Sequence, residues 1–166
     1  MVELLVMRHA KSDWDPAVAS DFDRPLARRG DRDAARMATW LDDEDLCPDH
    51  VASSSAVRAR ATAQYVVNHL GIRPRDFEVR DDLYLASAWD WMEFLNLQPA
   101  SRVMICGHNP GCDDLVEYLC AEDPPTTSSG KLMTTAAIAH FSFDVGWPDI
   151  GPASGTLLQL ARPKEI

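Results

Sequence analysis

The segment at residues 4–9 reads Leu-Leu-Val-Met-Arg-His, and it decides the fold because its apolar run stops abruptly at two polar residues. A short run rich in valine and leucine is typical of a strand buried on both faces of a parallel sheet. We therefore predict a strand over residues 2–7. Residues 102–106 repeat this pattern and lead into Gly107 and His108. A second histidine is thus expected at the end of a second strand.

Strands and helices alternate along the rest of the chain. Further strands are predicted over residues 50–54, 77–79, 137–143 and 156–160, and the last two are expected to pair as a hairpin at the sheet edge. Predicted helices open at Gly30, after a cap at Ser54 or Ser55, at residue 88, and at Pro110 with Asn109 as its cap. This order predicts an α/β fold, a three-layer α/β/α sandwich with a mostly parallel central sheet, in a single domain over residues 1–166.

Composition limits the possible partners and compartments. The chain has 166 residues and a formal net charge of -10, so broad binding to nucleic acid or an anionic membrane is not expected. Its cysteines lack CxxC spacing, which indicates free thiols in a reducing compartment; they are Cys47, Cys106, Cys112 and Cys120. The first apolar run is too short for a signal-peptide core, and no later run approaches a bilayer span. We expect a cytoplasmic protein with no nucleic-acid or membrane partner.

Two histidines and two arginines are expected to meet at one edge of the sheet. His9 and His108 follow strands whose carboxyl ends lie at the same edge, where α/β proteins bind ligands. Arg8 precedes His9, and Arg58 falls in the first turn of the intervening helix. Guanidinium groups offer paired donors that match the charged oxygens of a phosphoryl group. The sequence therefore predicts a local phosphate pocket set in an acidic surface.

Three segments resemble motifs of the histidine phosphatase superfamily, the group that includes the phosphoglycerate mutases. They are residues 4–12 (Leu-Leu-Val-Met-Arg-His-Ala-Lys-Ser), 55–63 (Ser-Ala-Val-Arg-Ala-Arg-Ala-Thr-Ala) and 105–111 (Ile-Cys-Gly-His-Asn-Pro-Gly). Their order and spacing fit across nearly the whole chain. The short length and the details of the first and third motifs make the chain most similar to SixA-type phosphohistidine phosphatases. The resemblance implies a phosphoglycerate mutase-like fold and a metal-independent phosphatase without a cofactor.

The resemblance also implies a role for each of the four residues. His9 would be the nucleophile that carries a phosphohistidine intermediate, Arg8 and Arg58 would clamp the phosphate, and His108 would stabilise the transferring group. These roles make chemical sense, because neighbouring guanidinium groups disfavour a protonated His9 and leave its lone pair available. A bound phosphate dianion should in turn favour a protonated His108 that acts as a donor.

A general acid is harder to find in the sequence. Many members of the superfamily supply a carboxylate from a loop after the third strand, and here only Asp81 and Asp82 are placed to substitute. Either residue could instead cap a helix or turn, and we favour that interpretation. A site without an effective general acid should prefer phosphohistidine as its substrate. The imidazole leaving group can be protonated before it departs, whereas an alkoxide needs a proton during departure.

Several other residues are predicted to be structural. Arg60 lies two positions beyond Arg58, so it points to a different helix face and should be solvated. The aromatic and apolar side chains of residues 89–95 are expected to pack in the core. No chemistry is assigned to the remaining histidines, which are predicted to be surface or edge residues; they are His50, His69 and His140.

Four rival functions are weighed against a histidine phosphatase. A cysteine phosphatase needs an arginine soon after its thiolate, and none follows Cys106; a magnesium-dependent aspartate phosphatase needs its acidic pair directly after the first strand, and Asp13 and Asp15 come too late. A mutase goes with longer insertions than this chain has. A phosphate-binding module without turnover stays open, although such a module would not need His9. The substrate is also open between a phosphohistidine on a partner protein, another phosphorylated side chain and a small phosphoester.

Overall fold

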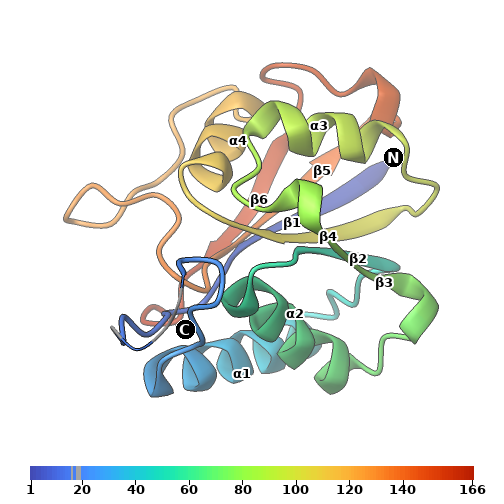
Figure 1. Ribbon diagram of the computed structural model, residues 1–166. Coiled ribbons are helices and arrows are strands. Elements are labelled where there is room, and N and C mark those ends of the chain that lie inside the picture. Colours follow the sequence, from blue (N-terminus) through green and yellow to red (C-terminus); the bar gives the residue numbers. More distant parts are fainter. Residues whose placement is uncertain (16, 18–19) are drawn as a thin grey trace.

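The computed structural model describes residues 1–15, 17 and 20–166. In that part of the chain, six strands form one sheet in the order β3-β2-β4-β1-β5-β6 (Figure 1). β3, β2, β4 and β1 are mutually parallel, whereas β5 is antiparallel to both β1 and β6. The strands are β1 (Val2–Arg8), β2 (His50–Ser54), β3 (Phe77–Arg80), β4 (Arg102–Gly107), β5 (Ile138–Phe143) and β6 (Thr156–Ala161). The predicted α/β fold with a mostly parallel sheet is confirmed.

Helices cover both faces of the sheet. α1 (Arg28–Asp43) and α2 (Val57–Leu70) lie on one face, and α3 (Ala88–Asn96) and α4 (Gly111–Leu119) lie on the other (Figure 1). Two clusters of buried apolar side chains fill the spaces between these layers. No helix of the described residues is long and apolar enough to cross a membrane.

The apolar run of β1 is explained by its place between the two core clusters. Leu4 and Val6 pack under α3 and α4, while Leu5 and Met7 pack under α1 and α2. All four side chains are fully buried, and each such burial contributes about 1.5–3 kcal/mol relative to exposure. A strand with two buried faces cannot show an alternating pattern, which is why the run is continuously apolar.

The loop after β1 is fixed against the start of α1. The Ala27 backbone N–H donates to the carbonyl of Lys11 at 2.9 Å. Gly30 lies so close to this carbonyl that a Cβ atom there would come within 2.0 Å of its oxygen. α1 begins at Arg28 rather than at the predicted Gly30, so this close approach lies inside the first turn of the helix.

The helix caps differ from the predicted ones. The residue before α2 is Ala56, and the Ser54 hydroxyl accepts a bond from its N–H at 3.2 Å, so neither serine occupies the cap position. α4 begins at Gly111, one residue after Pro110. Asn109 still binds the first turn of α4, because its side-chain oxygen accepts from the N–H of Asp113 at 3.3 Å.

His140 is a correction to the prediction of a surface or edge residue. It lies on β5, which has β1 on one side and β6 on the other, and its side chain is buried. Its Nε2 lies 2.8 Å from a carboxylate oxygen of Glu3, which also accepts from Arg102. The hairpin of β5 and β6 was predicted correctly, but only β6 forms the edge. The polar ring is satisfied by this partner, and the apolar sequence around it gave no sign of one.

Candidate active site

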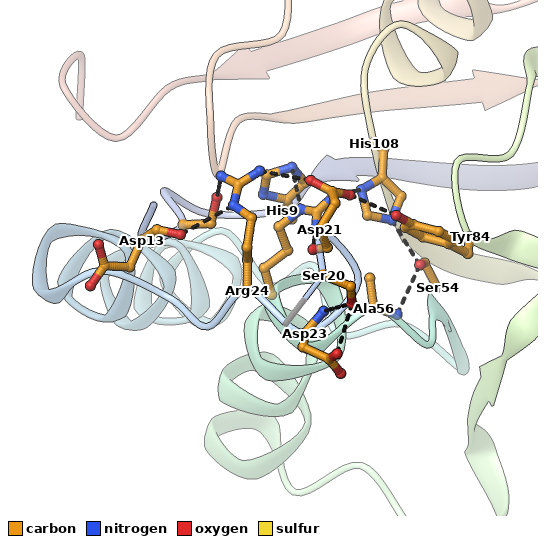
Figure 2. A network of polar contacts seen from close by, with 12 residues as sticks. His9, Asp13, Ser20, Asp21, Asp23, Arg24, Ser54, Ala56, Tyr84 and His108 are labelled. Atoms are coloured by element: carbon orange, nitrogen blue, oxygen red, sulfur yellow. Dashed lines mark hydrogen bonds and ion pairs between the residues drawn. The ribbon is translucent and has the colours of Figure 1, made fainter. Parts of the chain in front are cut away.

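Sheet register brings the two predicted histidines together. Arg8, at the end of β1, pairs with Gly107, at the end of β4, so the next residue of each strand is a histidine at the same edge. The ring centroids of His9 and His108 lie 5.2 Å apart, and both side chains are buried. Figure 2 shows the two rings side by side within one polar network.

His9 is held as a neutral ring with one nitrogen available. Its Nδ1 lies 2.7 Å from the Ala10 carbonyl oxygen, which can only accept, so Nδ1 carries the proton. Burial lowers the pKa of His9 from 6.5 to about 3, and the nearby positive charges of Arg58 and Arg8 act in the same direction. Nε2 therefore keeps its lone pair near neutral pH, as a nucleophile requires.

Arg58 connects both histidines to a carboxylate. It lies in the first turn of α2 and is buried; its Nε donates to His9 Nε2 at 3.3 Å, and a terminal nitrogen donates to His108 Nδ1 at 3.3 Å. The same guanidinium donates to the Asp21 carboxylate at 3.0 Å and to the Asp21 carbonyl at 2.6 Å. The predicted convergence of Arg58 with His9 and His108 is thus present in the structure.

His108 is the second neutral ring. Its Nδ1 accepts from Arg58, so the proton is on Nε2, which donates to the Ser54 hydroxyl at 2.7 Å. Burial, followed by the charge of Arg58, lowers the pKa of His108 to about 4. A phosphate dianion would oppose both effects, so the expected protonation of His108 on substrate binding remains a prediction.

Arg8 directly precedes His9 at the end of β1, and its charge is near enough to lower the pKa of His9. One terminal nitrogen donates to the carbonyl of Met133 at 2.9 Å, in the segment before β5. Its Nε is buried and has no hydrogen-bond partner among the described residues. A buried donor without a partner costs about 1–3 kcal/mol, so this N–H is suited to bind a ligand oxygen.

Asp21 and Tyr84 belong to the cluster and were not found from the sequence. Asp21 lies in the loop before α1, where its carboxylate accepts from Arg58, from Arg24 at 2.8 Å and from the Tyr84 hydroxyl at 2.6 Å (Figure 2). The Tyr84 hydrogen bond and then the arginines hold the pKa of Asp21 well below its usual range. Asp21 is therefore ionised and orients Arg58. In the sequence, Asp21 is one of two aspartates in the loop segment Ser-Asp-Phe-Asp-Arg-Pro at residues 20–25, and this pattern does not distinguish its role from that of a turn residue.

Asp81 and Asp82 do not join the cluster. Both are exposed, in a short 3-10 helix after β3, and the Asp82 carboxylate accepts two bonds from Arg80 at 2.6 and 2.9 Å. Among the described residues, neither aspartate makes a hydrogen bond to His9, Arg58 or His108. The Asp82 carboxylate is instead paired with Arg80, the last residue of β3.

The residues predicted to be structural lie outside the cluster of His9, Arg58 and His108. Arg60 is exposed, as predicted. Residues 91–95 pack in the core apart from Glu93, whereas Trp89 is exposed and its ring N–H donates to Glu93. His50 and His69 bind the carboxylates of Glu78 and Asp42.

The cysteines do not offer a rival nucleophile. All four are free thiols. Burial raises the pKa of Cys106 far above its usual range and that of Cys112 to about 12, so neither is a thiolate at neutral pH. In the described part of the chain, no three His, Cys, Asp or Glu side chains are grouped so that they could hold a metal ion.

Comparison with known proteins decides the family. The sequence profile of the histidine phosphatase superfamily (branch 1) matches residues 4–91, which is more than half of the chain. The chain belongs to this superfamily. A protein of Mycobacterium tuberculosis is 30% identical over 95% of this chain and 100% of its own length. A chloroplast protein of Arabidopsis thaliana is 29% identical over 92% of this chain and 72% of its own.

A solved structure extends this relationship to the whole chain. The protein histidine phosphatase SixA in complex with tungstate superposes with a TM-score of 0.81 at 26% sequence identity. The match covers 99% of each chain. The histidine phosphatase likeness inferred from three short motifs is therefore confirmed at the level of family and fold.

Proposed function

We propose that this chain is a single-domain, metal-independent phosphatase that transfers the phosphoryl group of its substrate to His9. The observation that carries the proposal is the state of His9, a neutral ring whose Nδ1–H is bound to a carbonyl and whose unprotonated Nε2 accepts a long hydrogen bond from Arg58, which an incoming phosphoryl group would replace. In the first step a bond forms between phosphorus and Nε2 while the bond to the leaving group breaks. Water then attacks the phosphohistidine, releases phosphate and restores His9.

The charged side chains supply the stabilisation that this transfer needs. Arg58 donates to His9 and Arg8 directly precedes it, and the Nε–H of Arg8, which has no partner among the described residues, would bind a phosphoryl oxygen. Preorganised donors of this kind act on the charge of the transferring group. His108 would add a further donor once a bound dianion has raised its pKa. No cofactor is required by this mechanism.

The leading candidate substrate is a phosphohistidine on a protein. Among the described residues, the carboxylate in contact with the cluster is Asp21, and its lowered pKa means that it cannot release a proton to an alkoxide. A leaving imidazole can be protonated beforehand. The overall similarity to SixA supports this substrate, and tungstate, a phosphate mimic, supports a phosphoryl ligand. The free thiols support a cytoplasmic location.

The test compares specificity constants. A phosphohistidine peptide should be hydrolysed with a higher kcat/KM than a phosphoserine peptide or an alkyl phosphate, and activity should survive EDTA. Asp81→Asn and Asp82→Asn should change none of these values, because neither side chain reaches His9. Equal turnover of alkyl phosphates that one of these substitutions selectively removes would show a working acid and refute the preference. Loss of activity in EDTA that a divalent metal restores would refute the metal-independent mechanism.

A further inference from the structure

A second basic pocket lies beside the candidate active site. It has a volume of about 450 Å³ and shares Arg8 with that site, but its lining includes none of His9, Arg58 and His108. Three segments distant in sequence form it: the loop after β1 with the start of α1, the segment between α4 and β5, and the chain after β6. These segments come to one end of the sheet, where the C-terminus lies near α1 (Figure 1).

The sheet order explains why these segments meet. β5 is antiparallel to β1, and β6 is antiparallel to β5, so the end of β6 lies at the same edge as the end of β1. Arg162, directly after β6, is buried and fastens the segment before β5, because its guanidinium donates to the carbonyls of Leu132 and Pro125. The pocket walls are therefore held by buried contacts rather than by surface side chains alone.

The charge of this pocket is opposite to that of the whole molecule. Six cationic side chains and two carboxylates line it, although the chain has a net charge of -10. Both carboxylates are already paired, Asp33 with Arg29 at 3.7 Å and Glu165 with Arg162 at 3.1 Å. The remaining cations have no carboxylate within 4.0 Å in the described part of the chain; they are Arg8, Lys11, Lys131 and Lys164. Hydroxyl groups of Thr127, Thr134 and Thr135 add neutral donors.

The position of Arg8 links the pocket to the reaction. Arg8 donates to the carbonyl of Met133, directly before the pocket residue Thr134, and its buried Nε has no partner among the described residues. Arg8 thus lines the pocket and directly precedes His9 at the end of β1, so a group in the pocket and a phosphoryl group at His9 would be near the same residue. The size of the pocket is that of a site for a small ligand or for part of a larger one.

We propose that this pocket binds a second anionic group, a phosphate or a carboxylate, carried by the same substrate whose phosphoryl group reaches His9. The inference rests on the proposed function in one respect, because it assumes that the phosphoryl group of the substrate reaches His9. Binding of the second anion in the pocket does not depend on that function. Two sources share this chemistry: a small compound with two phosphates, and a phosphohistidine protein with an acidic side chain near the modified residue. Charge-assisted bonds in a pocket of this kind are about twice as strong as neutral ones.

The experiment measures binding separately from turnover. With His9→Ala, calorimetry compares the bisphosphates and monophosphates of straight-chain diols of increasing length, and phosphohistidine peptides with flanking glutamate or glutamine. Either a bisphosphate of one linker length should bind at least about tenfold more tightly than the matching monophosphate, or the glutamate peptide should bind at least about tenfold more tightly than the glutamine peptide. One charge-assisted bond would provide this difference. Adding Lys131→Ala and Lys164→Ala should remove that advantage. Arg60→Ala, an exposed cation outside the pocket, is the matched control and should retain it.

The outcomes separate the two proposals. Equal binding of both members of every pair, or an advantage that survives loss of both lysines, would overturn the second site even if the wild type is an active phosphatase. An advantage that the lysine substitutions remove would establish the site even if the wild type has no turnover. Tighter binding of a bisphosphate would identify a small compound with two phosphates as the source of the second anion, and tighter binding of the glutamate peptide would identify a phosphohistidine protein. In an active enzyme the same substitutions should raise KM for the doubly anionic substrate about tenfold more than for its singly anionic partner.

Discussion

Arg58 is the side chain on which the arrangement of the two histidines depends. It donates to His9 and His108, and the nitrogen that binds His108 also donates to the Asp21 carboxylate. Arg58 and both histidines are buried, which protects the bonds among these three side chains from water, whereas Asp21 is exposed. Arg60 is only two residues away but points to solvent, because residues two positions apart on a helix do not share a face. A comparison of substitutions at Arg58 and Arg60 therefore distinguishes a specific role in the site from a general effect of losing one positive charge.

Arg58→Ala should lower kcat/KM about a hundredfold or more, the usual cost of removing one preorganised donor to a charged transition state. Arg60→Ala should leave kcat/KM nearly unchanged. Steady-state kinetics with one phosphorylated substrate, together with thermal unfolding to verify the fold of both variants, make the comparison. The opposite ranking would show that Arg58 does not act at the phosphoryl group.

At the scale of elements, the site depends on how β1 and its loop join α1. The carbonyl of Lys11 is bound by Ala27 N–H and lies against Gly30, so the loop that follows His9 cannot move independently of the helix. Ala10 N–H also donates to the Thr62 hydroxyl on α2 at 2.9 Å. These contacts fix the backbone around the nucleophile.

Gly30→Ala should destabilise the protein by about 1–3 kcal/mol, because the new methyl group would overlap the Lys11 carbonyl and force the backbone to shift. Gly151→Ala is the matched control, since an added Cβ there has no atom within 4 Å. Urea unfolding of the two variants measures the difference. Equal stability of Gly30→Ala and wild type would mean that the loop is not tightly packed on α1.

These elements also show what a sequence can predict. Continuous apolar strands ending in Arg8-His9 and Gly107-His108 predicted the sheet edge and the histidine pair, because strand length and polarity are local properties. Asp21 was missed since its partner Arg58 is 37 residues away and only tertiary structure joins them. The basic pocket escaped notice for the same reason: its lysines and arginines are scattered over the chain. His140 was misjudged because its carboxylate partner, Glu3, lies on another strand.

At the scale of the whole molecule, the two buried histidines of the site make the stability of the folded protein depend on pH. Both histidines are buried and neutral in the folded protein, with pKa values of about 3 for His9 and about 4 for His108. Unfolding would return each to its ordinary value of 6.5. Below pH 6.5 the unfolded chain therefore binds more protons than the folded one, and the free energy of unfolding must decrease as the pH is lowered.

The free energy of unfolding should decrease between pH 6.5 and 4.5, with each histidine contributing up to about 1.4 kcal/mol per pH unit. His9→Gln should have a shallower slope than wild type. Arg60→Gln, which replaces an exposed side chain on α2 that does not titrate in this pH range, is the control and should keep the wild-type slope. Urea unfolding at pH 6.5, 5.5 and 4.5 gives these slopes. Identical slopes for wild type and His9→Gln would show that His9 is not held neutral by the fold.

Trapping the phosphoenzyme tests the central claim most directly. Rapid acid-free quenching of the wild type with a radiolabelled phosphorylated substrate, followed by peptide mass spectrometry, should place one phosphoryl group on His9. The bond should be labile to acid and stable to base, as expected for a phosphorus–nitrogen bond, and His9→Ala should carry no label and have no turnover. Label on a carboxylate or a cysteine, or turnover by His9→Ala above a few per cent of wild type, would contradict the assignment of His9 as the nucleophile.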